Sequence, residues 1–258
     1  RGFPGWHIEC SAMASKYLGE QFDIHFGGQE HIAIHHTNEI AQAEGCFCHH
    51  LKNNTHWVQV WMHNAWLMNA KGEKMSKSEG EMATLSDVKT KGFSPLALRL
   101  FFFNAQYSTP QNFSWDALQG AQNAYNGLLE KLQEWESVPA DEKLETRGLE
   151  LKEKFDAALA DDLNTPVAVA TMWEVVKDGS LSIGQKKALL KDFDNVLSLG
   201  LSEVKKGGLN AEEQSLLDAR ADARKAKDFK KSDELRDKLA ALGVIVKDSK
   251  DGQTWTRK

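Results

Sequence analysis

The sequence has no uninterrupted apolar run of about eighteen residues, the length that a membrane-spanning helix requires. Its N-terminus also lacks the basic, then apolar, then small-residue order of an export signal. Only three cysteines occur in 258 residues, and an odd number argues against a disulfide framework and for a reducing compartment. These absences predict a cytoplasmic protein with no membrane partner.

Size and composition allow real hydrophobic cores. With 41% hydrophobic residues in 258, the chain is long enough for two or three domains. Residues 1–5 have the composition of the middle of a loop, and they include no initiator methionine. We therefore expect a part of a longer protein, and we expect a monomer because no long exposed apolar face is marked in the sequence.

Charge is unevenly distributed along the chain. The net charge is −5, but residues 205–258 contain 14 Lys and Arg against 10 Asp and Glu, whereas the remainder carries −9. A basic tail suits a polyanion such as nucleic acid. An ordinary solvated helix can carry the same charges, so this signal is weak by itself.

Histidine and cysteine are confined to one region. All nine histidines and all three cysteines lie between residues 7 and 63. Cys10, His35 and Glu39 offer a thiolate, an imidazole and a carboxylate, which are the ligand types of zinc. If the run His31 to Ala43 is helical, His35 and Glu39 share one face at i, i+4. Three protein ligands leave a position open, as in a catalytic or substrate-binding metal site.

Two other interpretations compete with this metal site. Cys10 can be a small buried hydrophobe, with His35 and Glu39 an ordinary polar pair on a solvated helix. The segment Cys46-Phe47-Cys48-His49-His50 is also rich in ligands. Adjacent side chains of this kind rarely all point at one ion, so it is the weaker candidate.

The first third of the chain alternates helix and strand. We expect a helix over Trp6–Leu18, a strand over Gln21–Phe26 that ends at Gly27-Gly28, a helix through Glu39, and a buried strand over Trp57–Met68. This alternation predicts one half of a parallel α/β sheet.

A second motif follows the polar turn at residues 70–73. Lys74-Met75-Ser76-Lys77-Ser78 places two lysines around small residues beside the expected sheet. Such a loop can fold over a triphosphate, where the charges of Lys74 and Lys77 count most as pyrophosphate leaves. A solvated basic loop explains two lysines but not the whole string.

From Ser94-Pro95 onward the pattern is helical. Ser94 and Thr165 are expected caps, each followed by proline, and Asn210 with Glu213 resembles a capping box. One buried stripe has helical spacing: Leu118, Ala121, Tyr125, Leu128, Leu132 and Trp135. Residues 136–148 predict a loop.

The tail predicts a small α/β unit. It comprises one helix over Ala211–Leu242, closed by Gly243, and a hairpin that turns at Asp251-Gly252. Arg224, Phe229 and Trp255 with nearby aspartates could face one partner, since aromatic rings stack on bases and arginine meets phosphate. Alternatively, Phe229 and Trp255 are the core of the hairpin.

Taken together, these motifs resemble those of cysteinyl-tRNA synthetases, which are class I aminoacyl-tRNA synthetases. The residues that carry the resemblance occur in the same order along the whole chain: Gly5 to Met13, Phe22 to His25, His35-His36 with Asn38 to Gln42, Lys74 to Ser78, Asp161 to Pro166, and Ala223 to Phe229.

The resemblance implies roles for individual residues. Cys10, His35 and Glu39 would be three of four ligands of a single zinc ion, the fourth lying in an N-terminal half of the catalytic domain that this chain lacks. Trp6 and His25 would line the cysteine pocket, and Lys77 would bind ATP. The bases of the anticodon would meet these tail residues: Arg224, Asp228, Phe229, Asp233 and Asp248.

The resemblance also implies an architecture that is α/β in its first part and mainly α afterwards. Residues 1–92 would be the second half of a Rossmann-like catalytic domain, 93–204 a helical bundle, and 205–258 a small C-terminal anticodon-reading domain. The implied partners are tRNA(Cys), L-cysteine and ATP with Mg²⁺, and the reaction passes through a cysteinyl-adenylate. Since the ATP-binding His-Ile-Gly-His signature is missing, the fragment alone is expected to be inactive.

Three positions depart from the family pattern. Phe26 stands where a glycine is usual, Ile34 replaces a proline and Thr37 replaces a glutamate.

Two rival functions stay open: a cysteine ligase that acts on a small amine, as in mycothiol synthesis, and a noncatalytic RNA-binding zinc fragment. Relatives of the first kind lack the anticodon-reading tail, so residues 205–258 favour tRNA.

Overall fold

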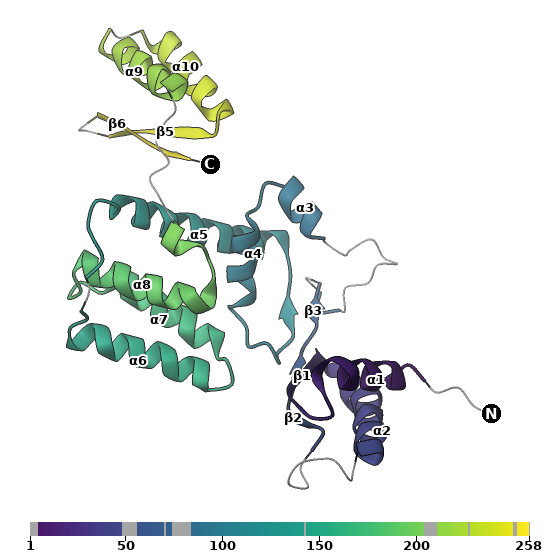
Figure 1. Cartoon of the computed structure of the whole chain (residues 1–258). Helices are drawn as coiled ribbons and strands as arrows, with labels where there is room; N and C mark the ends of the chain where they lie inside the picture. The colour runs from purple at the N-terminus through teal and green to yellow at the C-terminus, as the bar shows by residue number, and fades with distance from the viewer. Residues whose placement is uncertain are drawn as a thin grey trace.

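The computed structural model describes residues 5–47, 56–69, 71–73, 84–141, 143–203, 211–226, 228–249 and 252–257. Figure 1 shows three parts in chain order: a small α/β part, a bundle of helices, and a separate unit in which two helices lie beside a hairpin. Among the helices of these ranges, none combines the length and the apolar character needed to cross a membrane.

The α/β part is built around two parallel strands. Helix α1 (His7–Leu18) precedes β1 (Phe22–Gly28), and β2 (Val58–Asn64) pairs with β1 from Phe22↔Val58 to Gly28↔Asn64. Between the strands run a 3₁₀ turn η1 (Gln29–His31), a π-helical turn η2 (Ile32–His36) and α2 (Thr37–Phe47). The expected parallel half-sheet is confirmed.

Its small core lies where α1 and α2 meet the start of the strands. Ala43, Trp57 and Val58 are buried there, with Phe22 and Trp61 packed against them. A parallel strand pair needs a crossover of a dozen or more residues, and η1, η2 and α2 supply it. This crossover carries His35, His36 and Glu39 across one end of the sheet.

Several expected boundaries are wrong in detail. Gly27 and Gly28 belong to β1 rather than ending it. The strand expected over Trp57–Met68 is two strands. At the break the Ala65 amide donates to the Tyr107 carbonyl, and the Trp66 carbonyl accepts from the amide of Gln111 in β4 (Gln111–Asn112). The second piece, β3 (Leu67–Met68), pairs in parallel with β4.

The bundle begins after α3 (Leu85–Thr90). It contains α4 (Pro95–Phe102), α5 (Trp115–Glu134), α6 (Thr146–Ala160), α7 (Thr165–Lys177), α8 (Ile183–Leu197) and a 3₁₀ turn η5 (Leu201–Glu203). Ser94 caps α4 as expected, but Asn164 rather than Thr165 caps α7. Helix α6 starts at Thr146, inside the segment expected to be loop.

The bundle core contains most of the stripe read from the sequence. All six stripe residues of α5 and its C-cap are buried. Tyr125, Leu128, Leu132 and Trp135 pack in one cluster with the faces of α6, α7 and α8, whereas Leu118 and Ala121 join a smaller cluster around Phe101 and Phe113. The stripe is therefore core, as the spacing predicts.

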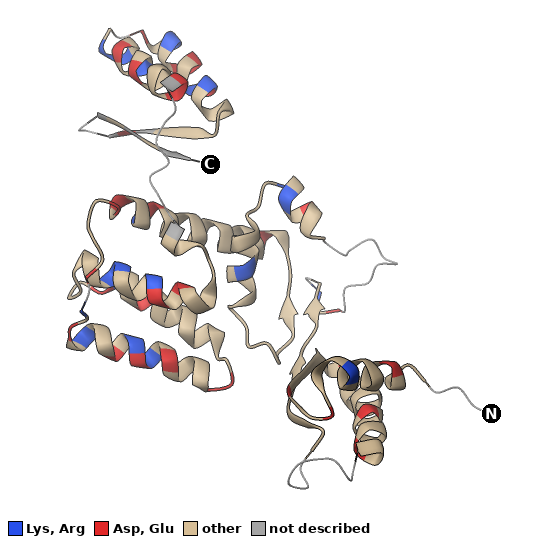
Figure 2. Ribbon diagram, in the orientation of Figure 1, with Lys and Arg blue, Asp and Glu red and all other residues tan. Residues whose placement is uncertain are grey.

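The C-terminal unit holds two helices, not one. Helix α9 (Ala211–Lys225) and α10 (Phe229–Ala241) form a hairpin over the antiparallel strands β5 (Val244–Ser249) and β6 (Gly252–Arg257). Asp228 caps α10 by accepting from the Lys231 amide, which starts a new helix where we expected a continuous one. Asn210 lies outside the described residues. In Figure 2 acidic and basic residues are interspersed on α9 and α10.

Candidate metal and substrate site

The carboxylate of Glu39 lies at the centre of the site. Glu39 is in the first turn of α2, and its exposed fraction is 0%. His35 and His36, one turn earlier in η2, are also buried. The distance from His35 Nε2 to Glu39 Oε1 is 3.5 Å, so the i, i+4 pair expected from the sequence faces one point.

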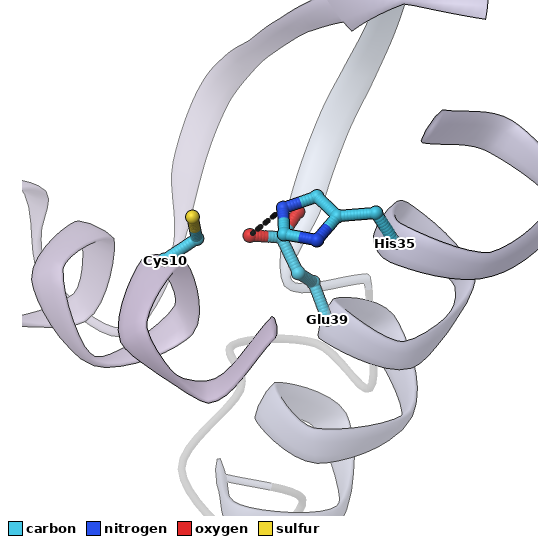
Figure 3. A group of neighbouring side chains, drawn as sticks. All are labelled: Cys10, His35 and Glu39. Carbon is cyan, nitrogen blue, oxygen red and sulfur yellow. Dashed lines mark ion pairs between the residues drawn. The ribbon is translucent and has the colours of Figure 1, made fainter. Parts of the chain in front are cut away.

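Cys10 reaches this point from α1. One donor atom each from Cys10, His35 and Glu39 lies within 4.8 Å of the other two. Figure 3 shows the sulfur of Cys10 on one side of the Glu39 carboxylate and the His35 ring on the other. The three residue types and their convergence match the open zinc sites found in proteins.

An unpartnered atom tests whether a cation fits there. Glu39 Oε1 is buried and has no hydrogen-bond partner. The facing nitrogen, His35 Nε2, lies 3.5 Å away and accepts a hydrogen bond of 2.9 Å from the indole Nε1 of Trp6, so a metal ion bound by this nitrogen would displace that hydrogen bond. A buried carboxylate oxygen without a hydrogen-bond partner is costly unless a positive charge lies beside it. The donor set therefore fits a metal ion.

The pKa values of the same residues follow from burial. Burial, and then the nearby Glu39 carboxylate, raise the pKa of the Cys10 thiol. Burial lowers the pKa of His35 and, with His25 beside it, lowers that of His36 to about 4. Both imidazoles are neutral at pH 7, the form in which histidine binds a metal.

More histidines surround Glu39 than the sequence interpretation used. His25 Nε2 donates to Glu39 Oε2 at 2.8 Å, and His36 Nδ1 lies 2.7 Å from His63 Nε2. His7 Nδ1 lies 2.9 Å from His35 Nδ1. The sequence motifs assign no role to His7, His36 or His63. The confinement of all histidines to residues 7–63 is the signal that could have found them.

The remaining predicted residues of this region divide into two groups. Trp6 and His25 do lie at the site, each hydrogen-bonded to one of the proposed metal ligands. Lys74 and Lys77 lie outside the described residues, between β3 and α3. Cys46, from the competing segment, is exposed near the end of α2 and belongs to neither possible metal group among the described residues.

The predicted tail residues lie around one end of the helical hairpin. Phe229 is 62% exposed at the start of α10, and Asp233 is exposed one turn later. Asp228 serves as the helix cap, while Asp248 binds both Arg220 and Arg224. Trp255 instead packs against the small core of the C-terminal unit. Of the two rings that the alternative interpretation placed in this core, Phe229 is therefore not part of it.

Three family models match consecutive parts of the chain. The class I (C) tRNA synthetase catalytic domain matches residues 1–123, the DALR domain matches 154–202, and the cysteinyl-tRNA ligase anticodon binding domain matches 206–255. The chain belongs to the cysteinyl-tRNA synthetase family. It carries part of a class I synthetase catalytic domain, followed by a DALR domain and by a domain of the cysteinyl-tRNA ligase anticodon binding type.

Curated cysteine–tRNA ligases match nearly all of the chain. The ligase of Treponema denticola is 37% identical over 286 aligned residues, with 100% of this chain and 57% of the relative covered. One from Burkholderia lata is 40% identical over 98% of this chain and 52% of its own length. The chain thus spans little more than half the length of these relatives.

A solved structure shares the fold. A LeuRS–tRNA–LeuAMS ternary complex from Agrobacterium radiobacter aligns over 70% of this chain and 26% of its own, with a TM-score of 0.52 and 16% sequence identity. At that identity the likeness concerns the architecture alone. It agrees with the α/β then mainly α class expected for a cysteinyl-tRNA synthetase.

Proposed function

We propose that this chain serves the ATP-dependent ligation of L-cysteine to tRNA(Cys) through a cysteinyl-adenylate. The observation that carries the proposal is the convergence of Cys10, His35 and Glu39 at a buried, unpartnered carboxylate oxygen. This site lies in the segment matched by a class I (C) synthetase catalytic domain. The same chain continues into a matched cysteinyl-tRNA ligase anticodon binding domain.

Cys10, His35 and Glu39 are the proposed ligands of one zinc ion. When bound there, zinc supplies a soft Lewis acid that accepts a thiolate far better than a serine hydroxyl. Selection of cysteine by a direct sulfur contact would make a separate editing site unnecessary.

Trp6 and His25 hold and shape the pocket around these ligands. The indole N–H of Trp6 donates to His35 Nε2, a bond that a zinc ion on this nitrogen would replace, and His25 fixes the Glu39 carboxylate through its other oxygen. Trp6 is 56% exposed, so its ring can also face a bound amino acid. Trp6 can therefore orient the substrate, while His25 keeps the Glu39 carboxylate in place.

Lys74 and Lys77 are assigned to the nucleotide. The proposed roles are binding of ATP by Lys77 and stabilisation by both lysines of the charge that develops as pyrophosphate leaves, with Mg²⁺ on the phosphates. In the sequence they follow β3 after the turn at residues 69–73. Attack of the cysteine carboxylate on the α-phosphate then needs mainly positioning and charge stabilisation.

The tail is assigned to the anticodon. Residues 205–258 would be the reading domain, 93–204 the bundle that spans the distance, and 1–92 the catalytic part. The match to an anticodon binding domain at 206–255 supports tRNA over the small-amine ligase, and the match to a class I synthetase catalytic domain at 1–123 argues against a noncatalytic fragment. Arg224, Asp228, Phe229, Asp233 and Asp248 stay the proposed contacts.

A spectroscopic experiment tests thiol selection directly. Co²⁺ replaces zinc in tetrahedral sites and gives a thiolate charge-transfer band in the near ultraviolet. In the Co²⁺-loaded chain, L-cysteine should increase that band because it adds a second sulfur, and L-serine should leave it unchanged. Cys10→Ser should lose the band. A wild-type chain without the band, or equal responses to cysteine and serine, would refute the proposed zinc site.

A further inference from the structure

The two oxygens of Glu39 face two different sets of side chains. Oε1 faces Cys10 and His35, which is the zinc site proposed above. Oε2 faces His25 at 2.8 Å and His36 at 3.9 Å. The second set, His25, His36 and Glu39, also brings one donor atom from each residue within 4.8 Å of the others. A carboxylate between two such sets is arranged to bridge two cations.

The position of His36 is closely constrained by its surroundings. A Cβ on Gly27 of β1 would lie 2.5 Å from His36 Cε1 and 2.8 Å from its Nε2, so the glycine leaves the space that the ring occupies. Trp61 of β2 packs at 4.8 Å between ring centroids on His36 and at 4.7 Å on His25. Gly27 of β1 and Trp61 of β2 thus fix the His36 ring, which faces Glu39.

His63 orients the same ring from behind. Its Nε2 lies 2.7 Å from His36 Nδ1, on the opposite side of the imidazole from Glu39. A metal-binding histidine characteristically donates its outer N–H to such a partner, which leaves the inner nitrogen free as a ligand. In that tautomer His36 Nε2 and Glu39 Oε2 present lone pairs to each other across 3.9 Å.

That separation suits an ion rather than a direct bond. It is too long for a hydrogen bond, so His36 Nε2 is not bonded to Glu39, whose Oε2 accepts from His25 alone of these two histidines. Zinc binds nitrogen and carboxylate oxygen at about 2.1 Å, so two of its ligands lie up to about 4.2 Å apart. His25 completes the set from β1, and its 2.8 Å hydrogen bond to Glu39 would open as the cation replaces the shared proton.

We propose that His25, His36 and Glu39 Oε2 form a second divalent-cation subsite, of the zinc type, that shares Glu39 with the Cys10 site. Its ligands are two imidazoles and one carboxylate with no sulfur, so its spectrum differs from that of the first site. It shares Glu39 and His25 with the proposed cysteine site, but it needs neither Cys10 nor a substrate and can be tested separately.

Co²⁺ titration of the metal-stripped chain, with bound metal measured by elemental analysis, tests the proposal. Wild type should bind one more Co²⁺ than His36→Gln. The ion lost in His36→Gln should lack the thiolate band, which should stay at full intensity. Cys10→Ser should lose the band and keep the sulfur-free ion. If His36→Gln binds as much Co²⁺ as wild type, the second subsite is refuted.

Two further variants separate ligand loss from misfolding. His63→Gln leaves all three ligands in place and should weaken the second ion about 10- to 100-fold, the usual effect of losing an outer partner. His56→Gln is the matched control, because His56 is 83% exposed and pairs only with Glu44 in the described structure. Weakening by His56→Gln equal to that by His63→Gln would contradict the proposal.

The Co²⁺ experiments distinguish failure of the zinc-site proposal from failure of the second-subsite proposal. If wild type and Cys10→Ser both lack the thiolate band while His36→Gln still loses one ion, the zinc site is wrong and the second subsite stands. If the band appears and responds to cysteine but His36→Gln loses nothing, the second subsite is wrong and the proposed function stands.

Discussion

The buried guanidinium of Arg220 binds Asp248 through two hydrogen bonds, each of 3.0 Å, to the two carboxylate oxygens. Arg220 is 1% exposed and comes from α9, whereas Asp248 comes from β5. Arg224 adds a third hydrogen bond to the same carboxylate. Asp248 therefore ties the helical hairpin to the strands, in addition to any contact it makes with tRNA.

Asp248→Asn should loosen the C-terminal unit. The substitution leaves the buried guanidinium without its counter-charge, which costs about 3 to 5 kcal/mol for a fully buried pair. Because the Asp248 side chain is 35% exposed, we expect roughly 2 kcal/mol. Hydrogen exchange of the α9 and α10 amides should accelerate accordingly. Asp233→Asn, an exposed aspartate on α10, is the control, and equal acceleration by both would contradict the assignment.

Phe229→Ala should weaken tRNA(Cys) binding without destabilising the protein. The ring is 62% exposed, so it adds little to the core but offers a face for a base. Stacking of a base on an aromatic ring contributes about 1–3 kcal/mol, which corresponds to a loss of about 5- to 150-fold in affinity. Filter binding measures it. Leu242→Ala, at the other end of α10 and 42% exposed, should bind normally; unchanged binding by Phe229→Ala would remove Phe229 from the interface.

The helical bundle should lose stability in acid. Hydrogen bonds from Ser180, and then from Arg147, hold the pKa of Asp178 well below its usual range, and Lys154 lowers that of Glu174. A depressed folded-state pKa means that the stabilisation is complete above the unfolded pKa, near 4, and disappears as pH falls below it.

Circular dichroism melts from pH 5 to 2.5 measure this loss. The melting temperature of wild type should fall over that interval, and Asp178→Asn should start lower and fall less. Asp23→Asn, which changes an exposed aspartate of β1 outside the bundle, should retain the wild-type slope. If the melting temperature of Asp178→Asn falls with pH as steeply as that of wild type, groups other than Asp178 cause the acid sensitivity.

Phe155→Ala should destabilise the bundle strongly. Phe155 of α6 and Phe193 of α8 stack with ring centroids 3.8 Å apart, and both are buried. Removal of a buried phenyl ring leaves a cavity and costs about 3–5 kcal/mol. Urea unfolding followed by circular dichroism measures the change. Leu149→Ala, on the same helix but 49% exposed, should cost far less; similar losses would contradict the packing argument.

Local patterns in the sequence predicted much of the fold. The α5 stripe was correct because a 3.6-residue repeat of apolar side chains has one low-energy solution, burial of that face. The parallel strand pair followed from alternation of strand and helix. The i, i+4 spacing of His35 and Glu39 placed both near one point, although the helix there begins with a π-helical turn.

Contacts between distant segments decided what local patterns missed. The break at residues 226–228 has no glycine or proline, so the sequence suggested one continuous helix. In the structure α10 turns back because Leu239 packs with Leu217 of α9 and with Val244 and Val246 of β5. Burial of that apolar cluster outweighs the local preference for continuing the helix.

The sequence by itself determined which residue types this protein offers as metal ligands, its membership of the synthetase family and the faces that must be buried. Each of these depends on residue type and short-range spacing. Only the tertiary structure decided that Glu39 lies between two histidine-containing sets. That arrangement requires α1, β1 and β2 to approach η2 and α2 together, and no local pattern specifies the relative placement of segments so far apart in the chain.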